Sequence, residues 1–391
     1  MVPSYEPFDR HSWRDPFSLY ARLRDEEPVH HSARHDLWVL TRHSDVYAAL
    51  LDTATFCSTR GISLTNERQK LPLLPTMVMM DPPEHTKYRR LVNRGFSPRN
   101  VQALEPELRA YVSECLDVLL DAGGGDLVAG LARPVPCFVV AHYLGVPAGD
   151  RTLFEDWTQA IVQANAGGNI LSAADALGEL YGYFTALVDR RRHQSGDDMV
   201  SSLLNAEPES VGITTEEVLG YAFVMIAGGN DTATGLIGGA AELLAAHPGQ
   251  RGRLSEDPSL IPVAVEELLR LTSPVQGLCR VTTRAVDVSG TKIAADSRVL
   301  LCYGSANRDR RAFGDDAEEL DITRAPKRVL AFGGGPHYCL GAQAARLEAR
   351  VVIEELLRRC PEFVVDAEGG SFADGPFVRR YESLPFLATA A

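Results

Sequence analysis

The chain has 391 residues, of which 45% are hydrophobic and 23% charged, as in a globular protein with a substantial core. Its 52 acidic and 39 basic residues give a net charge of -13, which argues against nucleic acid as a partner. The seven cysteines lack C-x-x-C spacing, and no secretory leader or membrane-spanning apolar run is present, so we expect a cytoplasmic protein without membrane insertion.

The first portion of the chain mixes strands with helices. Residues 37–42, "LWVLTR", have the pattern of a strand, and "HSDVYAALL" at 43–51 that of a helix with an aspartate near its start. Residues 61–84 are rich in proline and predict a long irregular loop, a kind of segment that is usually functional in a compact domain.

Residues 85–360 are predicted to be mainly helical. Apolar residues at helical spacing recur in five stretches, which are 85–95, 98–121, 137–144, 150–165 and 172–194. Glycine-rich segments at 123–125 and 166–169 interrupt this pattern.

The longest predicted helix covers 214–247. Thr214 and Glu217 form a capping box at its start, and Pro248 follows its end. At 1.5 Å per residue it would be roughly 50 Å long. Its first half is apolar on every side, so we expect it to run through the core.

The last third of the chain adds two helices and several strands. Helices are predicted over 259–274 and 340–360, and strands within 278–288 and 298–303. The tail at 361–388 alternates like strands. We therefore expect one domain over 1–391, mainly α with a minor β portion, whose β-rich segments include 35–75 and 361–388.

One short stretch, "FGGGPHYCLG" at 332–341, combines a thiol, an imidazole and three consecutive glycines. Cys339 lies at the N-terminal edge of a predicted helix, where the helix dipole should lower its pKa and favour the thiolate. It is therefore a candidate metal ligand or nucleophile, although a lone cysteine in such a loop is often structurally inert. A phosphate-binding loop is excluded because no Gly-Lys-Ser/Thr follows.

The same stretch resembles the haem-binding signature of the cytochrome P450 family. The matching residues, in order, are Phe332, Gly333, Gly335, His337, Cys339 and Gly341. The resemblance implies heme b (iron protoporphyrin IX) as the cofactor, with the thiolate of Cys339 as its metal ligand. It also implies the cytochrome P450 fold, with a long central helix over the haem and the cysteine loop leading into another long helix.

A second element of the resemblance is "EELLR", in which Glu267 and Arg270 lie one helical turn apart. Alone, this spacing is uninformative, because surface ion pairs with it are common. Its position upstream of the cysteine loop resembles the Glu-x-x-Arg element of the family. That resemblance implies a structural ion pair that braces the haem-binding core, with Glu266 fitting the pattern less well than Glu267.

The third element, "AGGNDTAT" at 227–234, places two glycines inside the longest predicted helix. They allow either a close contact with another helix or a groove where oxygen binds. Asp231 and Thr232 resemble the acid–alcohol pair of the family, which implies that they are catalytic and supply protons during oxygen activation. Ala233 departs from the pattern, because a second threonine is common there.

Basic residues accompany these elements. The resemblance implies that His85, Arg89, Arg280 and His337 bind the two haem propionates. A further group consists of Lys87, Arg90, Arg94, Arg99, Arg346 and Arg350. That group is either a solvated helix surface or a cationic docking face for an acidic ferredoxin.

Together, the resemblance implies a monooxygenase that inserts one atom of O2 into a lipophilic small molecule, such as a lipid, terpenoid, sterol or polyketide-like compound. Electrons would come from NAD(P)H through a ferredoxin reductase and a ferredoxin. Two alternatives stay open, which are a haem-thiolate sensor without turnover and a peroxide-driven peroxygenase. The segments expected to face the substrate are 62–80, 165–170, 223–228, 273–278 and 375–380.

Overall fold

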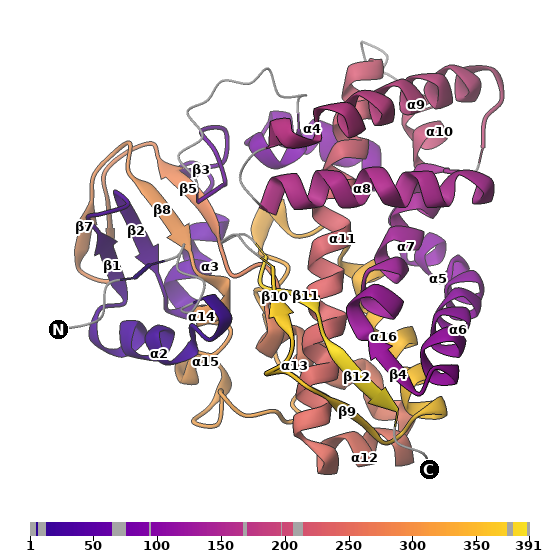
Figure 1. The fold of residues 1–391 in the computed structure, drawn as a ribbon. Coiled ribbons are helices and arrows are strands. Elements are labelled where there is room, and N and C mark those ends of the chain that lie inside the picture. Colours follow the sequence, from indigo (N-terminus) through magenta and orange to yellow (C-terminus); the bar gives the residue numbers. More distant parts are fainter. Residues whose placement is uncertain are drawn as a thin grey trace.

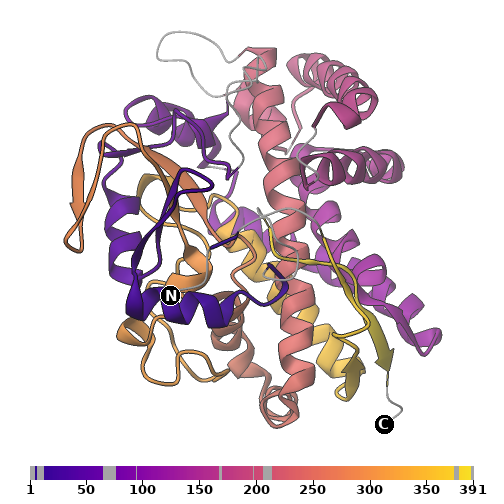
Figure 2. The same cartoon turned by 60° about the vertical axis from the view of Figure 1, so that its left-hand side comes forward.

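The computed structural model describes residues 5–6, 13–64, 76–93, 95–166, 170–196, 198–205, 214–373 and 378–388. One long helix, α11 (Thr215–Ala246), runs through the molecule between a mostly β region and a group of helices (Figures 1 and 2). Its 32 residues correspond to about 48 Å. The predicted capping box is present, since Thr214 accepts from the Glu217 N–H and the Glu217 carboxylate accepts from the Thr214 N–H.

Helices make up most of the described chain, as predicted. In chain order the α-helices before α11 are α2 (Phe17–Glu26), α3 (His43–Leu51), α4 (Glu84–Asn93), α5 (Pro98–Ala103), α6 (Glu105–Asp121), α7 (Pro134–Leu144), α8 (Arg151–Ala166), α9 (Ala174–His193) and α10 (Met199–Leu204). Those after it are α12 (Pro248–Glu256), α13 (Ile261–Thr272), α14 (Tyr303–Ala306), α15 (Arg310–Phe313) and α16 (Ala342–Arg359). Short 3-10 or π turns are η1 (Met77–Met79), η2 (Val128–Ala132), η3 (Ala148–Asp150), η4 (Ile170–Ala173), η5 (Pro258–Leu260) and η6 (Gly335–His337).

The prediction of a single helix over 98–121 was wrong. The chain forms α5 and α6 with a break at Leu104. Pro106 explains the break, because its ring would clash with the carbonyl four residues earlier and it has no N–H to donate. Proline at this position is favourable only in the first turn of a helix, which is where α6 has it.

The main sheet joins segments that are far apart in the sequence. Its strand order is β1-β2-β8-β5-β3, and β2 pairs in parallel with β8, with Val39 opposite Leu300. The bounds are β1 (Val29–Ser32), β2 (Leu37–Leu40), β3 (Phe56–Cys57), β5 (Leu278–Thr282) and β8 (Arg298–Leu301). The predicted strands at 37–42, 278–288 and 298–303 are therefore confirmed, with shorter bounds.

The C-terminal tail forms strands, as predicted. They are β9 (Phe363–Val365), β10 (Ser371–Phe372), β11 (Tyr381–Ser383) and β12 (Pro385–Ala388). β12 pairs with β9 and with β4 (Gly124–Asp126), while β10 pairs with β11 and β6 (Val286–Val288) pairs with β7 (Thr291–Ile293). The glycine run expected to be a break thus includes a strand. Gly124 is required there, because a Cβ would lie 2.3 Å from the carbonyl oxygen of Phe386.

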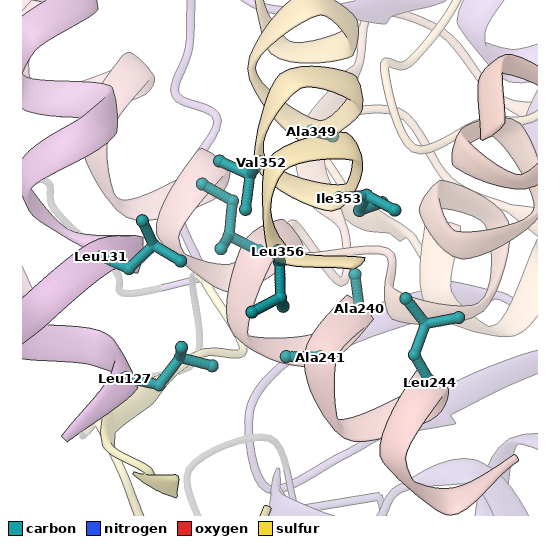
Figure 3. A pocket seen from close by; sticks show the side chains of 10 residues that line it. Leu127, Leu131, Ala240, Ala241, Leu244, Ala349, Val352, Ile353 and Leu356 are labelled. Carbon is teal, nitrogen blue, oxygen red and sulfur yellow. The ribbon is translucent and has the colours of Figure 1, made fainter. Parts of the chain in front are cut away.

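The largest hydrophobic cluster lies where α11 packs against α13 and α16, and α6 and α7 contribute side chains to it. A cavity of about 10 Å³ between α11 and α16 is lined by leucine, isoleucine, valine and alanine side chains (Figure 3). A space of this size and character holds no ordered water. The core beneath the site is therefore tightly packed and dry.

The first half of α11 was predicted to be surrounded by the core. The structure instead buries every residue of a stretch in its second half, 233–241. Glycines cause this, because they let neighbouring elements approach. A Cβ on Gly235 would lie 3.0 Å from the carbonyl oxygen of Arg379, and one on Gly239 would lie 2.8 Å from a methyl of Thr272. The first half is partly open, and Gly228 is exposed there.

Candidate active site

The cysteine loop, residues 332–341, contains the short turn η6 and ends at the first turn of α16. Its glycines have structural reasons to be glycines, since Gly333 and Gly335 have φ of 67° and 62°. A Cβ on Gly335 would also lie 2.6 Å from the carbonyl oxygen of Leu50. The Cys339 N–H donates to the Phe332 carbonyl at 2.9 Å, which closes the loop. Beside Gly341 no atom of the described chain lies within 4 Å of a built Cβ.

Cys339 is the only exposed cysteine of the seven. Even so, the protein around it is dense enough that desolvation raises the pKa of its thiol. The thiol of Cys339 is thus accessible to solvent and at the same time surrounded by protein atoms, so it lies in a recess of the surface. The backbone N–H groups of Gly341 and Ala342, together with Arg89 and Arg346, act in the opposite direction and favour the thiolate.

The expected lowering of the Cys339 pKa is therefore wrong for the protein alone. The predicted helix-terminal N–H groups are present, but the cost of burying a thiolate exceeds what they contribute. A bound cation would reverse that balance, because it stabilises the deprotonated sulfur directly. Among the described residues no group of three or more His, Cys, Asp or Glu side chains gathers as a metal site. One thiolate suffices only for a metal whose other ligands come from elsewhere, as the porphyrin supplies them in haem.

Four predicted propionate ligands come together next to this loop. The rings of His85 and His337 are 4.2 Å apart, and Arg89 Nη1 donates to the Pro336 carbonyl at 3.1 Å. His85 and Arg280 are 1% and 3% exposed, and His85 Nδ1 has no hydrogen-bond partner among the described residues.

The electrostatics of these four side chains favour an anion. Burial, followed by the charges of Arg280, His85 and Arg89, lowers the pKa of His337 to about 3. Asp81 raises the pKa of both histidines, and its Oδ1 lies 4.0 Å from His337 Nε2. Its oxygens also accept from the N–H groups of Ser58 and Thr59. Two arginine cations beside two imidazoles that can donate hydrogen bonds fit a ligand with two carboxylates, such as haem.

The two glycines of α11 have different roles. A Cβ on Gly229 would lie 2.8 Å from a methyl of Val140 in α7, which is the close helix contact considered from sequence. Gly228 has no atom of the described chain within 4 Å of a built Cβ, which is the open groove considered from sequence. Thr232 lies one turn later and donates its hydroxyl to the Gly228 carbonyl at 2.7 Å. The helix nevertheless runs unbroken through both glycines.

Asp231 makes a contact that the sequence did not predict. It is 7% exposed, and its carboxylate accepts from Arg380 Nε at 2.6 Å. Burial raises the pKa of Asp231 to about 6, although Arg380 acts to lower it. The sequence predicted only that the segment 375–380 lies near the site. No local spacing relates Arg380 to α11. The predicted pair of Asp231 and Thr232 is thus held by two hydrogen bonds that point to different partners.

The Glu-x-x-Arg prediction is confirmed in its geometry. Glu267 and Arg270 are both 0% exposed and are joined by two hydrogen bonds of 2.7 Å. Arg270 also donates to the carbonyls of Asn307 and Ala317, at 2.8 and 2.5 Å. Glu266 has a different partner, Arg346, as its spacing suggested. The pair ties α13 to the chain that leads into the cysteine loop.

The expected cationic face is smaller than predicted. Arg346 pairs with Glu266, and Arg350 pairs with Glu105 and Glu354, so neither arginine presents an uncompensated charge. Lys87, Arg90 and Arg99 are exposed. Arg94 lies outside the described residues.

The predicted substrate-facing segments are described only in part, because 65–75, 167–169 and 374–377 lie outside the described residues. In the segment 273–278, Ser273 and Gln276 are buried and donate to backbone carbonyls, while Oε1 of Gln276 has no hydrogen-bond partner among the described residues. Within the described ranges no helix is long and apolar enough to cross a membrane. The cytoplasmic location stays a prediction.

Comparison with known proteins agrees with this geometry. A family model described as Cytochrome P450 matches residues 183–369. Cytochrome P450 130 of Mycobacterium tuberculosis is 50% identical over 97% of this chain and 96% of its own length. Vitamin D(3) 25-hydroxylase of Pseudonocardia autotrophica is 38% identical, over 95% of this chain and 94% of its own.

A solved structure agrees as well. Cytochrome P450 PksS of the bacillaene polyketide synthase of Bacillus subtilis superimposes with a TM-score of 0.91 at 31% identity, covering 99% of this chain and 100% of that one. The match extends over the sheet, the long helix and the cysteine loop alike. The chain therefore belongs to the cytochrome P450 family of monooxygenases, which use haem and O2 and receive electrons from redox partners.

Proposed function

We propose that this cytochrome P450 hydroxylates a lipophilic small molecule, with electrons from NAD(P)H delivered through a ferredoxin reductase and a ferredoxin. The observation that carries the proposal is the convergence of three elements. A lone exposed thiol receives two backbone N–H groups, two arginines and two histidines gather beside it, and an acid–alcohol pair lies on the long helix.

In this proposal each residue has a distinct task. Cys339 holds the haem iron, with the amides of Gly341 and Ala342 directed at its sulfur. His85, Arg89, Arg280 and His337 hold the propionates, while Phe332 and Gly341 form the loop wall beside the ring. When bound, the haem supplies the activation of dioxygen. Asp231 and Thr232 supply protons.

The ferredoxin component of the proposal rests on the exposed cations of α4 and α5. Lys87, Arg90 and Arg99 have no compensating carboxylate in the described ion pairs, so they present positive charge on an otherwise acidic protein. An acidic electron carrier would be steered to such a face.

The substrate class is proposed from the apolar character of the segments around the site. Relatives named for vitamin D hydroxylation and for polyketide synthesis make a sterol-like or polyketide-like compound the first choice. The test is a spectral titration of the purified protein with a steroid, a secosteroid and a macrolide. A shift of the haem from low to high spin identifies compounds that displace water from the iron.

Turnover of the compound that gives the largest shift then decides between the proposed function and its alternatives. With ¹⁸O2, NADH and a surrogate ferredoxin system, the product should carry one labelled oxygen. Binding without any product would instead identify a sensor or carrier. Product formation with hydrogen peroxide, unimproved by the redox proteins, would identify a peroxygenase.

A further inference from the structure

A second cavity lies on the side of α11 to which Asp231 points. Its volume is about 30 Å³, and it is bounded by α7, α8, α11 and the strand β11. Asn230, Asp231 and Arg380 form its buried inner wall. Glu155, which is half-buried, and Glu382, which is exposed, form part of its outer rim. The cavity therefore extends from the interior toward the surface.

Water is the natural occupant of this cavity. An ordered water needs about 10–15 Å³ of such space and two or more polar partners, so about two waters fit. The walls are polar, and Oδ1 of Asn230 is buried without a hydrogen-bond partner among the described residues. A buried acceptor of this kind is normally satisfied by water.

Asp231 is the group through which this cavity meets the proposed catalytic pair. Its carboxylate lines the cavity and pairs with Arg380, whereas the Thr232 hydroxyl is bonded within the helix to the Gly228 carbonyl. Arg133 and Glu382 also act on the charge of Asp231. A proton that reaches the pair from solvent thus has a polar path on the side of Asp231.

Glu155 of α8 is suited to receive protons at the outer end of this path. Its side chain lines the cavity but is only half-buried, so it contacts both the cavity and the protein surface. Desolvation and the neighbouring Asp156 raise its pKa, while Arg133 lowers it. Glu382 is the other carboxylate among the lining residues, but it is exposed on β11, whereas the half-buried Glu155 extends into the cavity. Cys137 and Arg133, which pack on the cavity from the α7 side, offer no carboxyl group.

We propose that this cavity conducts protons from solvent to Asp231, with Glu155 as the acid that takes them up, and that Arg380 positions the Asp231 carboxylate to receive them. The inference rests on the proposed monooxygenase function, in which each product molecule is accompanied by one water and requires two protons. Glu155 gives its proton to a cavity water as that water gives one to Asp231. Solvent then reprotonates Glu155, and no electron moves along this path.

The test compares Glu155→Gln with Glu155→Asp and with Asp175→Asn, an exposed carboxylate on α9 that lies away from the cavity. Each holoenzyme is first checked by its reduced carbon monoxide spectrum. Product and peroxide formation are then measured in H2O and D2O, with the compound selected by the spectral titration. A high-resolution crystal structure of the parent provides an independent measurement of water in the cavity.

We expect Glu155→Gln to lower kcat by about tenfold, with KM unchanged, a larger solvent isotope effect and more peroxide for each NADH consumed. Glu155→Asp should recover most of this loss, and Asp175→Asn should behave like the parent. A cavity without ordered water, or a parental isotope effect in Glu155→Gln, would overturn the proton path alone. A parent enzyme that binds the compound but forms no product would instead refute the proposed function.

Discussion

The buried pair of Glu267 and Arg270 gives the sharpest prediction about stability. Replacing Glu267 by Gln keeps the shape of the side chain and removes its charge. The carboxylate accepts from Arg270 Nε and Nη2, both at 2.7 Å, and from Arg324 Nε at 3.1 Å. In the variant the buried Arg270 cation loses its counter-charge. The side-chain NH2 of the glutamine would also face an arginine N–H group, where two donors meet without an acceptor.

The expected loss follows from the complete burial of both side chains. Removing one partner of a buried ion pair costs about 3–5 kcal/mol, which is a large part of the roughly 5–15 kcal/mol that stabilises a typical domain. Asp189→Asn is the matched control, because Asp189 and Arg192 have the same i,i+3 spacing but are 63% and 45% exposed. That control should change stability by less than about 1 kcal/mol.

The assay is urea unfolding of the holoproteins followed by far-UV circular dichroism, with the slopes compared before the free energies. Glu267→Gln should unfold at clearly lower urea and release haem earlier than the control. If Glu267→Gln and Asp189→Asn lose the same small free energy, the argument from burial is refuted. The pair would then be dispensable for the core that holds the cysteine loop.

Three further predictions concern the site and the core. Thr232→Ala, which removes the hydroxyl next to Asp231, should still consume NADH but form hydrogen peroxide in place of most of the product. If a peroxide assay shows the same ratio of product to NADH consumed as in the parent, the role assigned to Thr232 is contradicted. Arg280→Leu should release haem to apomyoglobin at least about tenfold faster, because a hydrogen bond to a charged group contributes about 1.5–3 kcal/mol. The exposed Arg99→Leu is the control. Equal release rates in the two variants would show that Arg280 does not bind a propionate. Burial raises the pKa of Glu348 to about 8 from its usual 4.5, so the folded protein holds a proton that the unfolded chain releases, and stability should fall as pH rises between these values. In Glu348→Gln the urea midpoint should therefore fall less with pH than in the parent, and parallel pH dependences would show that the carboxyl is not buried in this way.

Local patterns predicted the parts of the structure that local interactions determine. Helix α3 begins and ends where its apolar spacing indicated, and the Thr214 capping box and the Glu267–Arg270 pair are present because each depends on three or four residues of one helix. The helix break at Leu104 also has a local cause, since Pro106 requires it even though the apolar periodicity continues across 98–121.

Tertiary contacts account for what the sequence did not reveal. The parallel pairing of β2 with β8 and the contact of Arg380 with Asp231 join segments that no local spacing relates. The pKa of Cys339 is raised and not lowered for the same reason, because the helix terminus is a local feature and desolvation depends on the whole surrounding fold. The loss of Arg346 and Arg350 from the cationic face likewise depends on glutamates of other helices.

Coordination of iron by the sulfur of one side chain is the claim on which the proposed chemistry depends. The direct measurement is the difference spectrum of the reduced protein with carbon monoxide, recorded for the parent and for Cys339→Ser, with Cys360→Ser as a buried-cysteine control. The account predicts the red-shifted band of a thiolate-ligated haem in the parent and in the control, and its loss in Cys339→Ser. Persistence of that band in Cys339→Ser, or a parent protein that binds no haem, would contradict it.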